Sequence, residues 1–172
     1  MRDLEVRPAR LADLEALVGA LGQQQFFIDR LARQNSGRGI LLTAWKGARA
    51  QGDVYLRLEP AEEPEIRMLL PGVPFLTHLE VVPRYQNRGI GTQLITAAER
   101  HLHRLGHDQV ALAVEITNLD AARLYKRLGY THWNHNPVVC YARLDDDRLS
   151  VRAEICDVLV KQLALPRPRG RR

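Results

Sequence analysis

The sequence predicts a mixed α/β (α+β) domain in which a central sheet of about seven strands is flanked by helices. Short apolar runs of strand length alternate with longer segments in which apolar residues recur every three or four positions. The strand–helix–strand order between residues 74 and 115 is typical of a parallel pair joined by a right-handed crossover. The chain of 172 residues is long enough to bury one core without disulfides.

The first third of the chain predicts a strand, two helices and a pair of strands. In the first helix Leu14, Leu17 and Leu21 share one face. The second helix ends at Asn-Ser-Gly, a common C-terminal signal. A Lys-Gly turn separates the two strands that follow. The expected ranges are strand 4–8, helix 11–21, helix 23–35, strand 39–46 and strand 53–58.

Residues 59–72, EPAEEPEIRMLLPG, predict a long loop with at most one helical turn. The segment holds three prolines and four glutamates, and a loop of this length in a compact domain is often functional. Glu59, Glu62, Glu63 and Glu65 could attract a cationic substrate or form a solvated surface. The sequence leaves both interpretations open.

The remainder of the chain predicts the parallel unit followed by a smaller strand pair. The last element is expected to be an amphipathic helix, because Val151, Ile155, Leu159 and Leu163 recur every four residues. The expected ranges are strand 74–82, helix 89–105, strand 109–115, helix 119–128, strand 130–135, strand 137–144 and helix 151–163.

The charge of the chain does not favour a nucleic-acid partner. The net charge is +5, but four of the 25 basic residues lie in the last seven, PRPRGRR, and the rest of the chain is close to neutral. We expect one domain over residues 1–165 and a basic, disordered tail over residues 166–172. No apolar run reaches the roughly 20 residues of a membrane helix, and no signal peptide is recognisable.

The two cysteines, Cys140 and Cys156, do not make a disulfide framework, so a reduced, cytoplasmic setting is the expectation. They also lack the spacing of metal ligands, and His78 with Glu80 alone is too little for a metal site, so no metal is expected. The sequence is compatible with a homodimer.

Residues Gln86 to Thr92, QNRGIGT, place two glycines where a helix begins. Glycine costs about 1 kcal/mol relative to alanine inside a helix, so another requirement must favour it here. The first N–H groups of a helix have no partner within the helix, and glycine lets the backbone approach an anion closely. Gly89 and Gly91, with Arg84 and Arg88 nearby, therefore suit a pyrophosphate. A tight packing turn would also explain them.

The surrounding sequence resembles the GNAT superfamily of acetyl-CoA-dependent N-acetyltransferases. The run LEVVPRYQNRGIGTQLITAAERHL is similar to that family's acetyl-CoA signature, and LAVEITNLDAARLYKRLGY is similar to its second signature. The opening VRPARLADLEAL resembles the usual first strand and helix. The resemblance covers roughly residues 4–135 and implies a GNAT-like fold whose sheet splays between its fourth and fifth strands.

The resemblance also implies an activity. An acetyltransferase of this kind transfers the acetyl group of acetyl-CoA to a primary amine by direct attack in a ternary complex. The acceptor would be a small cationic amine or antibiotic, or the amine of a peptide or protein. The alternative is a catalytically silent acyl-CoA-binding sensor or partner module.

The same resemblance assigns roles to particular residues. It implies that the end of the fourth strand pairs with the pantetheine arm, that the glycine loop holds the pyrophosphate, and that Tyr125 protonates the leaving thiolate. From the residues alone, Asn118 can also be interpreted as a helix N-cap, and Tyr125 can be interpreted as a core residue. The residues expected to contact coenzyme A are Leu79, Glu80, Val81, Val82, Gln86, Asn87, Arg88, Gly89, Ile90, Gly91, Thr92, Asn118 and Tyr125.

The general base departs from the pattern of the family. The positions where the family places a base match Phe75, Thr77 and Ala113, none of which can remove a proton. We expect Glu80 to be the base, with His78 on the same strand face as the alternative. In a regular strand Thr77 lies on the other face, although a bulge could redirect either side chain. Glu80 or His78 could instead have a purely structural role. Further candidates are Glu115, His132 and His135.

Overall fold

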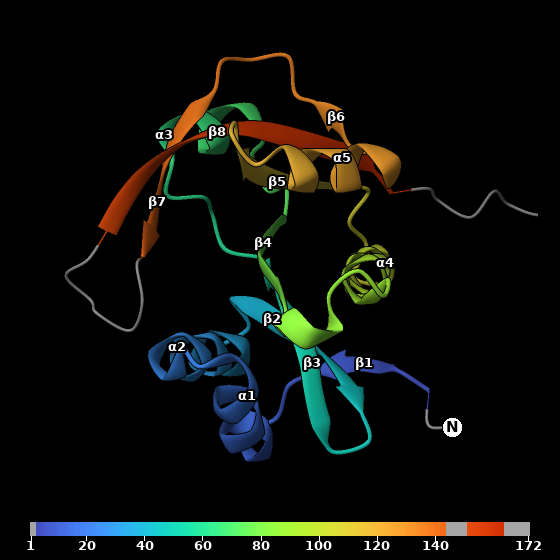
Figure 1. Ribbon diagram of the computed structural model, residues 1–172. Coiled ribbons are helices and arrows are strands. Elements are labelled where there is room, and N and C mark those ends of the chain that lie inside the picture. Colours follow the sequence, from blue (N-terminus) through green and yellow to red (C-terminus); the bar gives the residue numbers. More distant parts are fainter. Residues whose placement is uncertain (1–2, 144–150, 164–172) are drawn as a thin grey trace, which may run out of the picture.

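The computed structural model of the protein describes residues 3–143 and 151–163, which form one eight-stranded sheet with helices on both faces (Figure 1). The strand order is β1-β2-β3-β4-β5-β8-β6, and β7 also pairs with β8. The expected tail, residues 166–172, lies outside the described residues. The strands are β1 Glu5–Pro8, β2 Gly39–Lys46, β3 Arg49–Arg57, β4 Phe75–Val81, β5 Gln109–Glu115, β6 Thr131–His132, β7 Val138–Arg143 and β8 Val151–Gln162.

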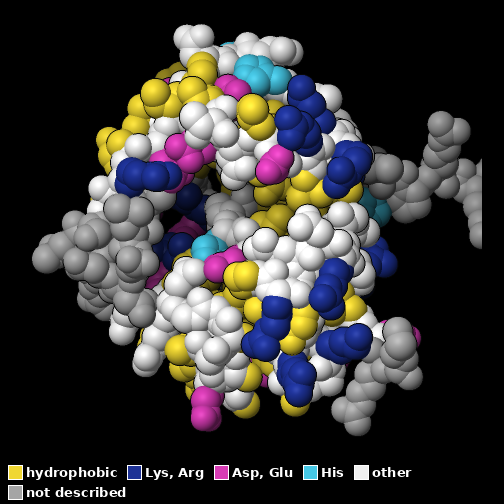
Figure 2. Space-filling view, viewed as in Figure 1, with side chains coloured by type: hydrophobic (Ala, Val, Ile, Leu, Met, Phe, Trp, Pro, Cys, Tyr) yellow, Lys and Arg dark blue, Asp and Glu magenta, His cyan; other side chains and the backbone are white. Residues whose placement is uncertain are grey.

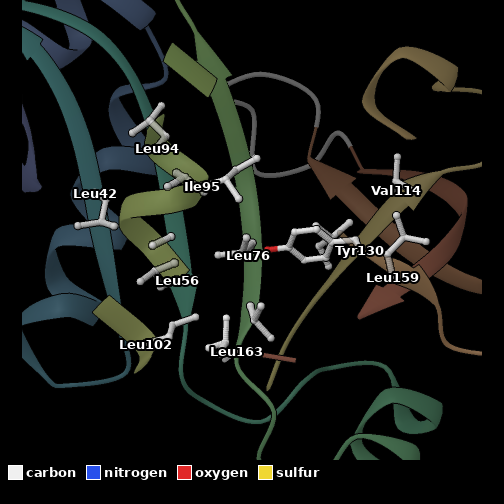
Figure 3. Packing of buried hydrophobic residues seen from close by; sticks show 14 of the residues in the cluster. Leu42, Leu56, Leu76, Leu94, Ile95, Leu102, Val114, Tyr130, Leu159 and Leu163 are labelled. Atoms are coloured by element: carbon white, nitrogen blue, oxygen red, sulfur yellow. The ribbon is translucent and has the colours of Figure 1, made fainter. Parts of the chain in front are cut away.

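The helices divide the sheet into two covered faces. The pair α1 and α2 packs on the face of β2 and β3 that carries Leu41 and Tyr55, whereas α4 packs on the face that carries Leu42 and Leu56. Figure 3 shows the second of these cores around α4. No helix of the described residues has the length and apolarity that a membrane crossing needs. The helices are α1 Leu14–Leu21, α2 Gln24–Asn35, α3 Pro64–Leu69, α4 Ile90–Arg104 and α5 Leu119–Arg127.

The expected terminal helix over residues 151–163 is wrong, because this segment is the long strand β8. The consecutive residues Val158 and Leu159 pack into different cores on opposite faces of the sheet. A strand that is buried on both faces has apolar neighbours in sequence, and this pattern imitates a helical stripe. The missed signal was the alternation of Cys156, Val158 and Val160, which all belong to one face. With β8, the sheet has eight strands instead of about seven.

β8 also connects the other C-terminal strands with one another and with α4. It pairs with β5 along the whole of that strand and with β6 and β7 on the other side. The Lys161 ammonium on β8 lies 2.9 Å from the Glu99 carboxylate on α4, and the Tyr130 hydroxyl donates to the same carboxylate at 2.9 Å. Burial and the adjacent Glu99 charge raise the pKa of Tyr130, so its hydroxyl remains a donor.

The feature that positions the site is the early separation of β4 and β5. These parallel strands pair only at Phe75–Ala111 and Leu76–Leu112, close to the start of β4. Beyond Leu76 the two strands diverge, and Figure 1 shows β5 and β8 crossing above while β1–β4 lie below. The expected splay between the fourth and fifth strands is therefore consistent with the observed pairing.

The strand geometry of β8 predicts unequal effects of two substitutions. Leu159→Ala should lower the free energy of unfolding by about 2–5 kcal/mol, because the side chain is buried in the α4 core. Ile155→Ala should change it by less than about 0.5 kcal/mol, because Ile155 is 53% exposed. Urea denaturation measures both. A helix would bury both residues on one stripe, so equal losses would contradict the strand.

Candidate functional site

A β-bulge in β4 forms the centre of the site. Asp53 of β3 is opposite Glu80, and Tyr55 is opposite Thr77, so β4 carries one extra residue between these pairs. His78 takes the left-handed conformation, with φ of 52°, as the bulge requires. The bulge puts Glu80 on the face of Thr77, where a regular strand would have placed it on the opposite face.

The two strands approach closely at this bulge. Gly52 of β3 lies opposite Val81, and a Cβ atom there would be 2.5 Å from the carbonyl oxygen of Glu80. No side chain fits at that distance, so the glycine permits the backbone contact. Gly52 therefore permits the backbone conformation of the bulge that carries His78 and Glu80.

Three side chains and one amide form a hydrogen-bonded cluster around the bulge. The His78 Nδ1 atom lies 2.9 Å from Asp53 Oδ2, and its Nε2 atom lies 3.0 Å from Gln23 Oε1 and 3.3 Å from Glu80 Oε2. The Gln23 amide nitrogen donates to Glu80 Oε2 at 2.8 Å. Both expected base candidates, Glu80 and His78, thus lie in one network, which we call the His78 cluster: Gln23, Asp53, His78 and Glu80.

The His78 cluster has a covered side and a partly exposed side. The Phe26 ring of α2 stacks on the His78 ring with centroids 3.8 Å apart. The side chain of His78 is 23% exposed and that of Glu80 is 35% exposed. Figure 2 shows histidine and acidic side chains bordering the hollow between the two halves of the sheet. The partly exposed side chains of His78 and Glu80 are therefore accessible to a ligand.

Asp53 is the buried end of the cluster. Its side chain has no exposed surface, and its Oδ1 atom has no hydrogen-bond partner among the described residues. Burial raises the pKa of Asp53, whereas the hydrogen bond from His78 opposes this effect. A buried carboxylate with one unpaired oxygen is costly, so it is an unusual choice for a purely structural position.

The three ionisable groups of the cluster are also the kind of donors that bind metals. The ligand atoms of Asp53, His78 and Glu80 lie within 4.8 Å of one another. However, Asp53 meets one ring nitrogen and Glu80 meets the other. Each carboxylate is thus within hydrogen-bonding or ion-pair distance of its own ring nitrogen. The geometry suits proton exchange better than a single metal ion.

The glycine loop joins the end of β4 to α4. A 3-10 turn, Pro83–Tyr85, leads into it, and α4 begins at Ile90. Gly89 caps the helix with φ of 79°, and a Cβ there would meet nothing within 4 Å. At Gly91 a Cβ would touch only Leu79, at 3.8 Å. Space therefore exists beside the free N–H groups of the first turn, where an anion could bind.

Two arginines border this loop. The guanidinium groups of Arg84 and Arg88 lie 5.3 and 5.8 Å from the centre of the Tyr85 ring. Their charge adds to the positive end of the α4 dipole. The Gln86 amide donates to the Val81 carbonyl at 3.1 Å and so connects the loop to the end of β4.

Asn118 and Tyr125 lie on the other side of the splay, at the end of β5 and on α5. The Asn118 side chain accepts a hydrogen bond from Ala121 N at 3.2 Å, so its expected role as an N-cap is confirmed. Tyr125 packs against the α4 core and edge-on to Tyr130. Burial raises the pKa of Tyr125 to about 12, so the hydroxyl keeps its proton at neutral pH.

The remaining candidates are engaged elsewhere. Glu59 of the acidic loop pairs with Arg33 of α2, which reduces the capacity of that loop to attract a cation. Glu115 lies 3.3 Å from Arg152, and His132 lies 3.4 Å from Asp157. The His135 ring lies edge-on to the Trp133 ring, with centroids 5.1 Å apart. None of these contacts involves the His78 cluster.

Sequence reasoning missed two members of the cluster, Asp53 and Gln23. The predicted strand begins at Asp53, whereas β3 begins at Arg49 and Asp53 lies in its middle. A charged residue within an apolar strand was the available signal. Gln23 joins α1 to α2 with φ of 54°, and no local pattern indicates its contact with β4.

Comparison with known proteins identifies related sequences. Residues 14–130 match the model of the acetyltransferase (GNAT) family. A mycothiol acetyltransferase of Pseudarthrobacter chlorophenolicus is 30% identical over 96 residues, which cover 56% of this chain and 28% of the relative. The matches span about a quarter of the length of such relatives.

Solved structures share the fold at low sequence identity. The ribosomal-protein-S18-alanine N-acetyltransferase of Escherichia coli has a TM-score of 0.69 and 15% identity, over 97% of this chain and 98% of that chain. The PaiA N-acetyltransferase of Thermoplasma acidophilum, in complex with coenzyme A, has a TM-score of 0.66 and 16% identity, over 93% and 99% of the two chains.

The two glycines of the loop predict different effects on stability. Gly89→Ala should lower the free energy of unfolding by roughly 1–2 kcal/mol, because its φ of 79° is unfavourable for a residue with a Cβ. Gly91→Ala should not lower it, because the new methyl has room and alanine favours a helix. Thermal and urea unfolding measure both, and a loss at Gly91 equal to that at Gly89 would contradict this geometry.

Proposed function

Because the chain belongs to the acetyltransferase (GNAT) family, we propose that it transfers the acetyl group of acetyl-CoA to the primary amine of an acceptor. The observation that carries the proposal is the pairing of an open glycine loop with a bulged strand at the splay of the sheet. The glycine loop suits an anionic coenzyme, and the bulge brings candidate proton acceptors to β4, the strand that leads into this loop.

The residues of the chain fit acetyl-CoA. The N–H groups of the first turn of α4 and the open space at Gly89 and Gly91 suit the pyrophosphate, with Arg84 and Arg88 adding positive charge. Beyond Leu76 the backbone of β4 is separated from β5, and an extended pantetheine arm can pair with such an edge.

The chemistry requires a neutral amine and a proton for the leaving sulfur. The amine nitrogen bonds to the carbonyl carbon and the carbon–sulfur bond breaks. The His78 cluster takes the proton of the amine, and Tyr125 donates a proton to the sulfur. Its pKa of about 12 keeps Tyr125 protonated until the thiolate forms. Solvent then restores both groups.

The acceptor is proposed to be a cationic amine. Glu80 and Asp53 bring two carboxylates to one side of the splay, which favours an ammonium group over an anion. Mycothiol acetyltransferases and N-terminal acetyltransferases occur among the relatives, so both a small amine and a peptide amine belong in the acceptor panel.

Acetyl-CoA should raise the thermal midpoint of the protein. A ligand at 100 times its Kd that binds only the folded state adds about 2.7 kcal/mol of stability. Gly91→Val should abolish this rise while the variant without ligand stays folded, because the added methyl groups enter the space beside the helix N-terminus. A wild-type response in this variant would place the phosphates elsewhere.

Tyr125→Phe should lower kcat by roughly 10²–10⁴-fold, the range for one positioned acid. The affinity for acetyl-CoA should barely change, because the ring and its packing on Tyr130 remain. Free thiol release with the amine panel gives kcat, and Tyr141→Phe, at an exposed tyrosine, serves as the matched control. If the Tyr125→Phe variant keeps the kcat of the wild type, solvent donates the proton and Tyr125 does not. Acetyl-CoA binding without thiol release from any amine would favour the silent binding module.

A further inference from the structure

We propose that Asp53 is a positioning residue that holds His78 by Nδ1, so that Nε2 receives the proton of the acceptor amine. Gln23 occupies that nitrogen in the free protein and yields it to the acceptor. The inference rests on the proposed acetyl transfer and assigns the proton acceptor within the His78 cluster. It gives the leading role to His78, with Glu80 as its partner.

The order of the groups is that of a proton relay. Asp53 lies on the buried side of the ring at 2.9 Å from Nδ1, and Glu80 lies on the exposed side at 3.3 Å from Nε2. A neutral ring whose Nδ1–H donates to Asp53 leaves a lone pair on Nε2. That nitrogen is the one on the side of the partly exposed Glu80, where an acceptor can approach.

Several groups around the ring can stabilise a positive charge that develops on it. The Gln23 NH₂ group donates to Glu80, which turns the Gln23 carbonyl toward Nε2 at 3.0 Å. A carbonyl oxygen only accepts hydrogen bonds, so it can accept one from Nε2 once this nitrogen carries a proton. The Phe26 face stacks on the ring and also favours a cation. The opposing charge is Arg30, which lies over Phe26.

The arrangement therefore places groups around Nε2 that can stabilise the ring once it takes a proton. During transfer, an N–H bond of the acceptor ammonium breaks and the Nε2–H bond forms. The positive charge passes from the ammonium to the imidazole ring, between Asp53 and Glu80. The freed lone pair of the amine then attacks the acetyl carbon. Stabilising the charge where it develops is what a base site must achieve.

Gln23 marks the position of the acceptor. Its amide satisfies Nε2 of His78 and Oε2 of Glu80 together, which an incoming amine would also do. Gln23 takes a left-handed conformation that is unfavourable for a residue with a Cβ. A strained residue that touches a reactive group is a reasonable candidate for a replaceable placeholder.

The cost of Asp53 distinguishes this role from a structural one. Its burial raises its pKa, so its contribution to stability is greatest below the ordinary pKa of an aspartate and declines as pH rises through the raised value. At pH 8 the charged carboxylate of Asp53 therefore lowers the free energy of unfolding.

Asp53→Asn separates the two roles. The asparagine preserves the shape, so the thermal midpoint at pH 8 should equal or exceed that of the wild type. The value of kcat should fall at least tenfold, within the roughly 10²–10⁴-fold that a positioned base contributes. The rising limb of kcat/KM against pH should move to lower pH, because the imidazolium loses a carboxylate. The KM for acetyl-CoA should stay unchanged.

Two further variants complete the test. The double variant Asp53→Asn/His78→Gln should be no slower than His78→Gln alone, because Asp53 acts through His78. Thr43→Val removes another fully buried polar group of the sheet and should lower stability without changing kcat. Glu80→Gln should slow the reaction less than His78→Gln.

The outcomes separate this inference from the proposed function. An active wild type with an equally active Asp53→Asn variant at every pH would overturn the relay alone. Additive losses in the double variant would also overturn it, as would loss of activity in a chelator with recovery in Zn²⁺. Retained acetyl-CoA binding without turnover of any amine would instead overturn the proposed acetyl transfer.

Discussion

The pairing of β4 with β5 through only two residue pairs is the constraint on which the rest of the site depends. Parallel strands that continued side by side would satisfy each other's backbone groups and close the sheet. Here β4 instead twists away at a bulge, and its hydrogen bonds continue only toward β3. The open side of β4 and the redirected side chains both result from this one departure from regular pairing.

The rest of the architecture keeps the two halves of the sheet in place despite this opening. The α4 helix packs on the lower strands through Leu94 and on the upper half through the Glu99–Lys161 ion pair. Tyr130 inserts between these elements, as Figure 3 shows, and its hydroxyl completes the same contact. A partly buried, hydrogen-bonded ion pair with these partners resists sliding of one half of the sheet past the other.

Stability and reactivity oppose each other at the bulge. His78 adopts a strained backbone conformation, Gln23 does the same, and Asp53 is buried with an unpaired oxygen. Each of these features costs folding free energy, and together they surround one imidazole ring. Strain and buried charge are concentrated at the proposed reaction site, and the large cores on both faces of the sheet offset them.

The sequence by itself determined most of the secondary structure and the position of the glycine loop, because periodicity and the helix-initiating glycines are local properties. It also predicted Glu80 and His78 as the leading candidates for the general base. It misassigned β8, since a strand buried on both faces lacks simple alternation. Only the tertiary structure decided the partners of His78. Asp53 and Gln23 reach it through the pairing of β3 with β4 and the packing of α2, and such contacts between distant residues leave no periodic trace in one chain.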